Sequence, residues 1–69
     1  MGYPYKLYIG TADDQKIYAH TGEVRYAMIY INEKLGTSWD KYHTVTHATI
    51  WEKTPDGYKI LSVSTTEKG

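Results

Sequence analysis

Cysteine is absent from this 69-residue chain. Disulfides and thiolate metal sites both require cysteine, so neither can stabilise the fold. A chain of this length buries only about 60% of the surface that its unfolded form exposes, and it is usually too short for two independent domains. We therefore expect one small domain over residues 1–69, with residues 66–69 as a frayed tail.

An excess of charge of one sign is also missing, because eight Lys and Arg balance eight Asp and Glu. A domain that binds the backbone of nucleic acid normally shows an excess of positive charge, and a mimic of DNA shows the opposite. Any role with nucleic acid must therefore rest on a local patch.

Long apolar runs are missing too, since none approaches the roughly 20 residues that span a bilayer. The N-terminal segment MGYPYKLYIG lacks the basic stretch and apolar core of a secretory signal. From these absences we expect no membrane association and a cytoplasmic location.

Catalytic motifs are the last absence. The chain has no G-x-S-x-G, no H-E-x-x-H, no phosphate-binding glycine loop and no cysteine nucleophile. The adjacent Asp13 and Asp14 are typical of turn chemistry. His43 and His47 are expected on one strand, where four residues span about 13 Å, too far to share a metal ion. We predict a protein that is not an enzyme and holds no cofactor or metal.

The first half of the chain predicts a hairpin and then a helix. Tyr5, Leu7 and Ile9 alternate with Lys6 and Tyr8, which indicates a strand over residues 5–9. A polar turn follows, and residues 16–20 return as a strand with Ile17 and Ala19 on one face.

The helix is predicted at residues 22–35. Thr21 is its expected N-cap, Glu23 lies in its first turn, and Gly36 follows its C-terminus. Apolar residues at spacings of three and four form its core stripe: Val24, Ala27, Met28, Ile31 and Leu35.

A second hairpin follows a connection over residues 36–42 that carries Trp39. Strands are expected at residues 43–53 and 58–65, joined by a turn in which Pro55 and Gly57 supply the required backbone angles. In the expected register Trp51 pairs with Ile60, and the core face has Ile50 opposite Leu61 and Ala48 opposite Val63. The prediction is an α+β fold of order ββαββ, an antiparallel sheet of about four strands with one amphipathic helix on one face. The strand order stays open.

Aromatic residues carry the functional hypothesis. The chain has eight tyrosines and two tryptophans but no phenylalanine, a composition that suits half-buried and interface positions. The helix has a second apolar side, and the outward face of the second hairpin is aromatic. The candidate contact residues are Tyr26, Ile29 and Tyr30 on the helix, and Trp51, Tyr58 and Ile60 on the sheet.

We interpret these surfaces as those of a small protein-binding module, an inhibitor or adaptor of the phage accessory type, that forms a homodimer and binds a protein target. One alternative is a nucleotide or nucleic-acid binder, in which tyrosines stack on bases and Arg25, Lys53 or Lys59 contact phosphate. The other is a structural component of a larger assembly.

Overall fold

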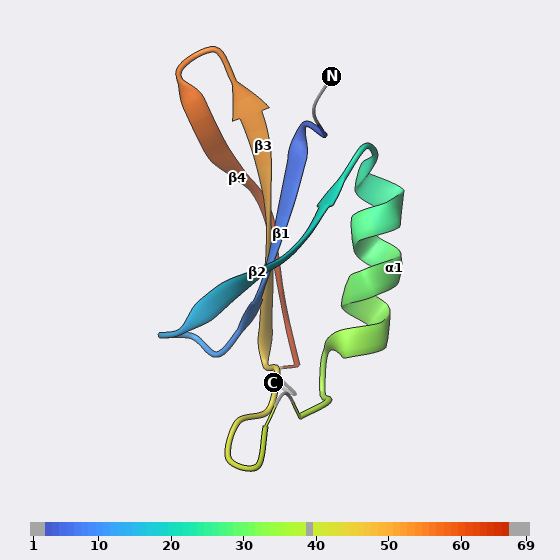
Figure 1. The fold of residues 1–69 in the computed structure, drawn as a ribbon, viewed down its shortest axis with the longest axis vertical. Helices are drawn as coiled ribbons and strands as arrows, with labels where there is room; N and C mark the ends of the chain where they lie inside the picture. The colour runs from blue at the N-terminus through green and yellow to red at the C-terminus, as the bar shows by residue number, and fades with distance from the viewer. Residues whose placement is uncertain (1–2, 39, 67–69) are drawn as a thin grey trace.

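The computed structural model describes residues 3–38 and 40–66. Its elements are β1 (Tyr5–Gly10), β2 (Gln15–Thr21), α1 (Val24–Lys34), β3 (His47–Thr54) and β4 (Gly57–Thr65). The strands form one antiparallel sheet in the order β2-β1-β3-β4, and α1 lies on one face of it (Figure 1). The α+β class and the ββαββ order are confirmed.

The two hairpins are joined through their first strands. β1 pairs with β3 from Tyr5 opposite Glu52 to Gly10 opposite His47. Backbone hydrogen bonds continue the ladder at both ends, from Lys53 to the Pro4 carbonyl at 2.8 Å and from Thr46 to the Gly10 carbonyl at 2.9 Å. This pairing places β1 and β3 at the centre of the sheet and leaves β2 and β4 as its edges.

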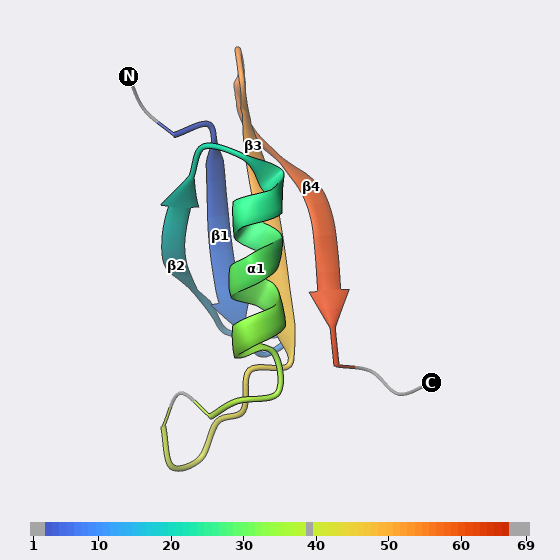
Figure 2. The same ribbon diagram turned by 90° about the vertical axis from the view of Figure 1, so that its right-hand side faces the viewer.

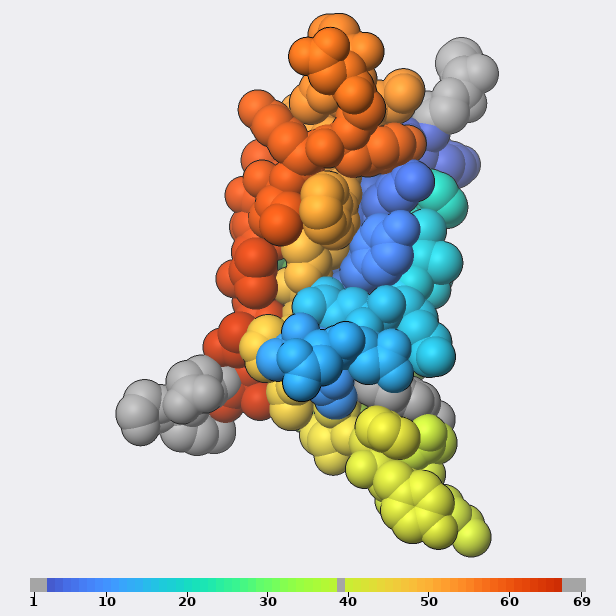
Figure 3. All heavy atoms as spheres, turned by 90° about the vertical axis from the view of Figure 1, so that its left-hand side faces the viewer, coloured from blue at the N-terminus to red at the C-terminus, as the bar shows by residue number. Residues whose placement is uncertain are grey.

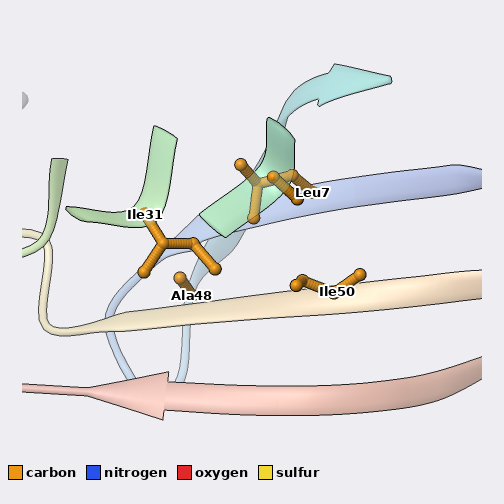
Figure 4. Close-up of a cluster of buried hydrophobic side chains, with 5 residues drawn as sticks. Leu7, Ile31, Ala48 and Ile50 are labelled. Carbon is orange, nitrogen blue, oxygen red and sulfur yellow. The ribbon is translucent and has the colours of Figure 1, made fainter. Parts of the chain in front are cut away.

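The core lies between α1 and the two central strands. Leu7 from β1 and Ile50 from β3 are opposite each other in the register and are fully buried. Ile31 extends from the helix towards Ala48 (Figure 4). Side chains alternate between the faces of a strand, so the neighbours of these core residues point away from the helix.

The helix is shorter than predicted and begins differently. Glu23 is its N-cap residue and makes no side-chain capping bond. The expected cap Thr21 is instead the last residue of β2, and its hydroxyl donates to the Glu23 carbonyl at 3.1 Å. Met28, predicted in the core stripe, is exposed, because the helix buries Ala27 and Ile31. In the described parts of the chain, no helix has the length and apolar character to cross a membrane.

The first hairpin contains a bulge that the sequence pattern conceals. Leu7 is opposite Ala19, whereas Tyr8 is opposite Ile17, so Tyr18 is an additional residue in β2. Ile17 and Ala19 therefore accompany residues on opposite faces of β1. The prediction that they share one face is wrong, because an extra residue reverses the alternation beyond it.

The second hairpin has a comparable bulge in β4. Trp51 pairs with Ile60 as predicted, but Ile50 pairs with Ser62 and Ala48 with Ser64. The predicted partners Leu61 and Val63 are 40% and 54% exposed rather than buried in the core. One additional residue between Ile60 and Ser62 accounts for both errors. The turn itself is confirmed, with Gly57 at φ +135°.

The prediction that the third strand begins at residue 43 is wrong, because β3 begins at His47. Residues 43–46 belong to the connection between α1 and β3. Val45 is buried, and its backbone stabilises the connection. Its carbonyl accepts a hydrogen bond from the Gly36 amide at 2.8 Å, and its amide donates to the Thr37 carbonyl at 2.7 Å. Trp39 lies outside the described residues. Residues 67–69 of the predicted tail also lie outside the described residues. Thr66 is described, and its amide donates to the Thr46 carbonyl at 3.0 Å.

Replacing Ile50 by alanine should lower the free energy of unfolding by about 3 kcal/mol, because the site is fully buried and a cavity remains. The matched control is Ile29→Ala on the helix, where the side chain is 52% exposed and the expected change is within about 0.5 kcal/mol. Urea unfolding followed by circular dichroism measures both. Equal losses in the two variants would contradict the assignment of the core.

Candidate binding surface on the open sheet face

In the part of the chain that the structure describes, no other element covers the sheet face opposite α1, and we call this surface the open face (Figure 3). Alternate residues of three strands present their side chains on it. They come from β1, β3 and β4 and meet at the register pairs Lys6–Trp51, Tyr8–Thr49 and Trp51–Ile60. Tyr8 of the first hairpin and Trp51 of the second therefore meet on one surface.

A hollow of about 520 Å³ occupies the open face. Its floor belongs to the three strands, and the turn between β1 and β2 borders one side, on the side of the sheet away from α1 (Figure 1). The lining residues are Lys6, Tyr8, Ala12, Asp13, Gln15, Thr49, Trp51, Tyr58 and Ile60. A hollow of this size has the volume of a small-ligand or side-chain pocket.

Gly10 allows the turn to take this position. Its φ is +156°, and a Cβ atom at this residue would lie 2.0 Å from the Asp14 carbonyl oxygen. Two hydrogen bonds close the turn, from the Thr11 amide to the Asp14 carbonyl at 3.0 Å and from the Asp14 amide to the Thr11 hydroxyl at 3.2 Å. The turn that carries Ala12 and Asp13 therefore depends on glycine at the end of β1.

The aromatic rings of the hollow contact one another and two lysines. Tyr8 and Trp51 meet edge to face, with ring centroids 6.4 Å apart and an interplanar angle of 65°. The Tyr58 ring has the Lys6 ammonium 4.1 Å from its centroid and the Lys53 ammonium at 5.3 Å. These cation–π contacts gather positive charge at the Tyr58 end of the hollow. Asp13 carries negative charge at the turn.

A partly buried hydrogen bond sets the polar part of the lining. Thr49 is almost fully buried, and its hydroxyl donates to the side-chain carbonyl of Gln15 at 2.7 Å. The bond joins β3 to β2 across β1 and fixes the Gln15 amide. Its NH₂ group is then a donor that a bound molecule can use.

The predicted sheet candidates Trp51, Tyr58 and Ile60 all line the hollow. Sequence reasoning missed Lys6 and Tyr8, although both alternate with the core residues of the first strand. That alternation places them on the outward face, but only the strand order places this face beside Trp51.

The helix candidates Tyr26, Ile29 and Tyr30 lie elsewhere. The Tyr30 ring packs edge to face on Tyr18 of β2, with centroids 5.6 Å apart. Tyr26 and Tyr30 line a second, smaller hollow of about 320 Å³ together with Tyr3, His20, Thr21, Gly22 and Glu23. Ile29 is not among these lining residues. The outer side of the helix is therefore divided, with the tyrosines turned towards β2.

The cations proposed for phosphate are not brought together. Arg25 pairs with Glu23 at 2.7 Å beside the helix N-terminus. Lys59 pairs in register with Glu52 and alternates with Tyr58 and Ile60, so it lies on the helix side of the sheet. Of the predicted set, Lys53 is the one on the open face.

The connection holds a carboxylate with a lowered pKa. Asp40 accepts hydrogen bonds from the amides of Tyr42 at 2.7 Å and His43 at 2.9 Å, and its carboxylate lies 3.0 Å from the His43 ring nitrogen. The Tyr42 amide is the main cause that lowers the pKa of Asp40, and the His43 side chain adds to it. His43 thus lies in a loop, not on the strand where it was expected. Within residues 3–38 and 40–66, no group of three or more His, Asp or Glu is arranged to hold a metal.

Comparison with protein-family models, with curated proteins and with solved structures finds no significant match to this chain. The function must therefore be argued from the open face itself.

Replacing Gly10 by alanine should destabilise the protein by about 2 kcal/mol or more, because the new Cβ collides with the Asp14 carbonyl. Gly57→Ala is the matched control, since its φ is also positive but nothing lies within 4 Å. Thermal unfolding compares them. If Gly57→Ala is the more damaging change, the close approach at Gly10 is unimportant.

Acidification should release the loop held by Asp40. The folded pKa is lowered, so the stabilising contribution is fully present above the ordinary carboxyl pKa and is lost as pH falls through the lowered value. The protection factor of the Tyr42 amide, which compares its hydrogen-exchange rate measured by NMR with the rate of an unstructured chain at the same pH, should fall in Asp40→Asn and at low pH. Slow exchange in Asp40→Asn would show that the backbone holds the loop without the charge.

Proposed function

We propose that this chain is a non-enzymatic protein-binding module whose open face binds an extended segment of a partner protein. The observation that carries the proposal is the convergence of Tyr8, Trp51, Tyr58 and Ile60 in one hollow that no element of the described chain covers. Aromatic side chains around a concave surface are typical of the residues that dominate binding energy at protein interfaces.

Charge and size define the partner. Lys6 and Lys53 are positive at the Tyr58 end, and Asp13 is negative at the turn. From Thr49 to Lys53 the floor is about 13 Å long, the length of roughly four extended residues. The fitting segment has an apolar side chain over Trp51 and an acidic group towards Tyr58. Occupying such a segment suits an inhibitor or adaptor.

The nucleotide alternative shares the aromatic floor but has weaker support. Binding to a nucleic-acid strand requires several cations that follow its backbone. Arg25 and Lys59 lie away from the hollow, and Asp13 adds negative charge beside it. A protein segment needs fewer positive contacts, so the open face favours it.

Selection from a random peptide library on the immobilised protein tests the proposal. Enriched peptides should combine an apolar or aromatic residue with a nearby Asp or Glu. Trp51→Ala should weaken their binding by at least about thirtyfold, as for a central interface residue. Ile29→Ala, on the opposite side of the molecule, should bind as the native chain does. Circular dichroism confirms that each variant is folded.

Charge and competitor arms complete the experiment. Lys6→Glu with Lys53→Glu should weaken acidic peptides by about tenfold and leave neutral ones unchanged. Peptides that bind Trp51→Ala as well as the native chain would overturn the proposal. A fluorescent oligothymidine that binds in a Trp51-dependent and strongly salt-dependent way would replace it by the nucleotide alternative.

A further inference from the structure

β4 is an edge strand, and beyond its bulge at Leu61 it has little protection against pairing. Residues 60–66 read Ile-Leu-Ser-Val-Ser-Thr-Thr and contain no charge, proline or glycine. Natural edge strands usually carry such residues, because a bare edge pairs with other chains. The helix packs over the other three strands, and β4 stands clear of it at the side of the sheet (Figure 2).

The backbone of β4 presents hydrogen-bonding groups outwards. The Thr66 amide donates to Thr46 at 3.0 Å, so it points inwards towards β3. In an antiparallel ladder, the backbone groups of successive residues point alternately towards the neighbouring strand and away from it. The amides and carbonyls of Ser62 and Ser64 therefore also point to β3, and those of Val63 point to the outer edge. The Val63 side chain is more than half exposed. Val63 is therefore the centre of an uncharged edge.

The opposite edge is defended. The bulge at Tyr18 interrupts β2, and the Tyr18 ring packs on Tyr30 of the helix. The Lys34 ammonium lies 5.6 Å from the same ring, and Lys16 adds a charge within the strand. The packing of Tyr18 on the helix and the charges of Lys16 and Lys34 discourage strand addition at β2.

We propose that β4 pairs antiparallel with β4 of a second copy, about a two-fold axis at Val63, to form a continuous eight-stranded sheet. The segment suits itself, because Val63 meets Val63 and Ser62 meets Ser64 of the second copy. Lys59 is the one charged residue of β4 and lies outside these pairs, so no like charges oppose one another. Two identical edges form a closed interface.

The proposal goes beyond the binding function of the open face and stands without it. It also changes what that face offers. Both hollows lie on the same side of the extended sheet, and Tyr58 and Ile60 of each β4 line them. The dimer therefore presents two binding hollows beside its axis.

Sedimentation equilibrium over a concentration range tests the dimer. The native chain should reach twice the mass of one chain at protein concentrations below about 1 mM. Val63→Lys should remain a monomer, because two ammonium groups would meet at the axis. Ile17→Lys places the same charge on β2, where the native side chain is also exposed, and should leave the dimer intact. Circular dichroism excludes unfolding.

A cross-link keeps the test decisive even if Val63→Lys unfolds. The chain contains no cysteine, so Val63→Cys introduces a single thiol. The Cα atoms of a hydrogen-bonded antiparallel pair lie about 5.5 Å apart, within the range of about 4.4–6.8 Å that a disulfide spans. Mild oxidation should give a covalent dimer much faster than in Ile17→Cys. Equal rates of cross-linking would overturn the proposal, and so would a native chain that is monomeric at every concentration. It would also be overturned by a dimer that dissociates in the double variant Tyr26→Ser and Ile29→Ser but persists in Val63→Lys.

Discussion

Antiparallel pairing between β1 and β3 is the interaction on which the rest of the structure depends. It brings together residues more than 40 positions apart, such as Leu7 and Ile50. On the helix side this pairing completes the core under Ala27 and Ile31. On the other side the same register places Lys6 and Tyr8 beside Trp51 and Thr49. Core and hollow are the two faces of a single strand pairing, so a change in its register would disturb both.

The sequence predicts what depends on local chemistry. The alternation of Tyr5, Leu7 and Ile9 predicts a strand with one covered face, and Pro55 and Gly57 predict the second turn. The errors arise where one residue is added. Trp51 opposite Ile60 is predicted correctly, yet one step further the partner of Ile50 is Ser62. A bulge at an edge strand leaves no periodic signal before the partner strand is known.

The candidate site divides in the same way. Trp51, Tyr58 and Ile60 could be placed together because a tight turn fixes the register of their hairpin. Lys6 and Tyr8 belong to the other hairpin, and only the strand order brings them to the hollow. The helix residues Tyr26, Ile29 and Tyr30 share an arc of the helical wheel, but the position of β2 separates them, because Tyr18 engages Tyr30. The order of strands and the tilt of a helix arise from long-range packing, which one local pattern does not encode.

The boundary between β1 and β3 divides the chain into an amino-terminal part, β1-β2-α1, and a carboxy-terminal hairpin, β3-β4, linked by the exposed loop around Asp40 and Tyr42. The hollow straddles this seam, with Lys6 and Tyr8 from one part and Trp51 and Tyr58 from the other. A molecule bound in the hollow contacts both parts at once and holds them together across the β1–β3 boundary. Occupancy and folding are then thermodynamically linked, and a ligand that binds only the joined state raises its stability in proportion to the logarithm of its concentration once the site is nearly saturated.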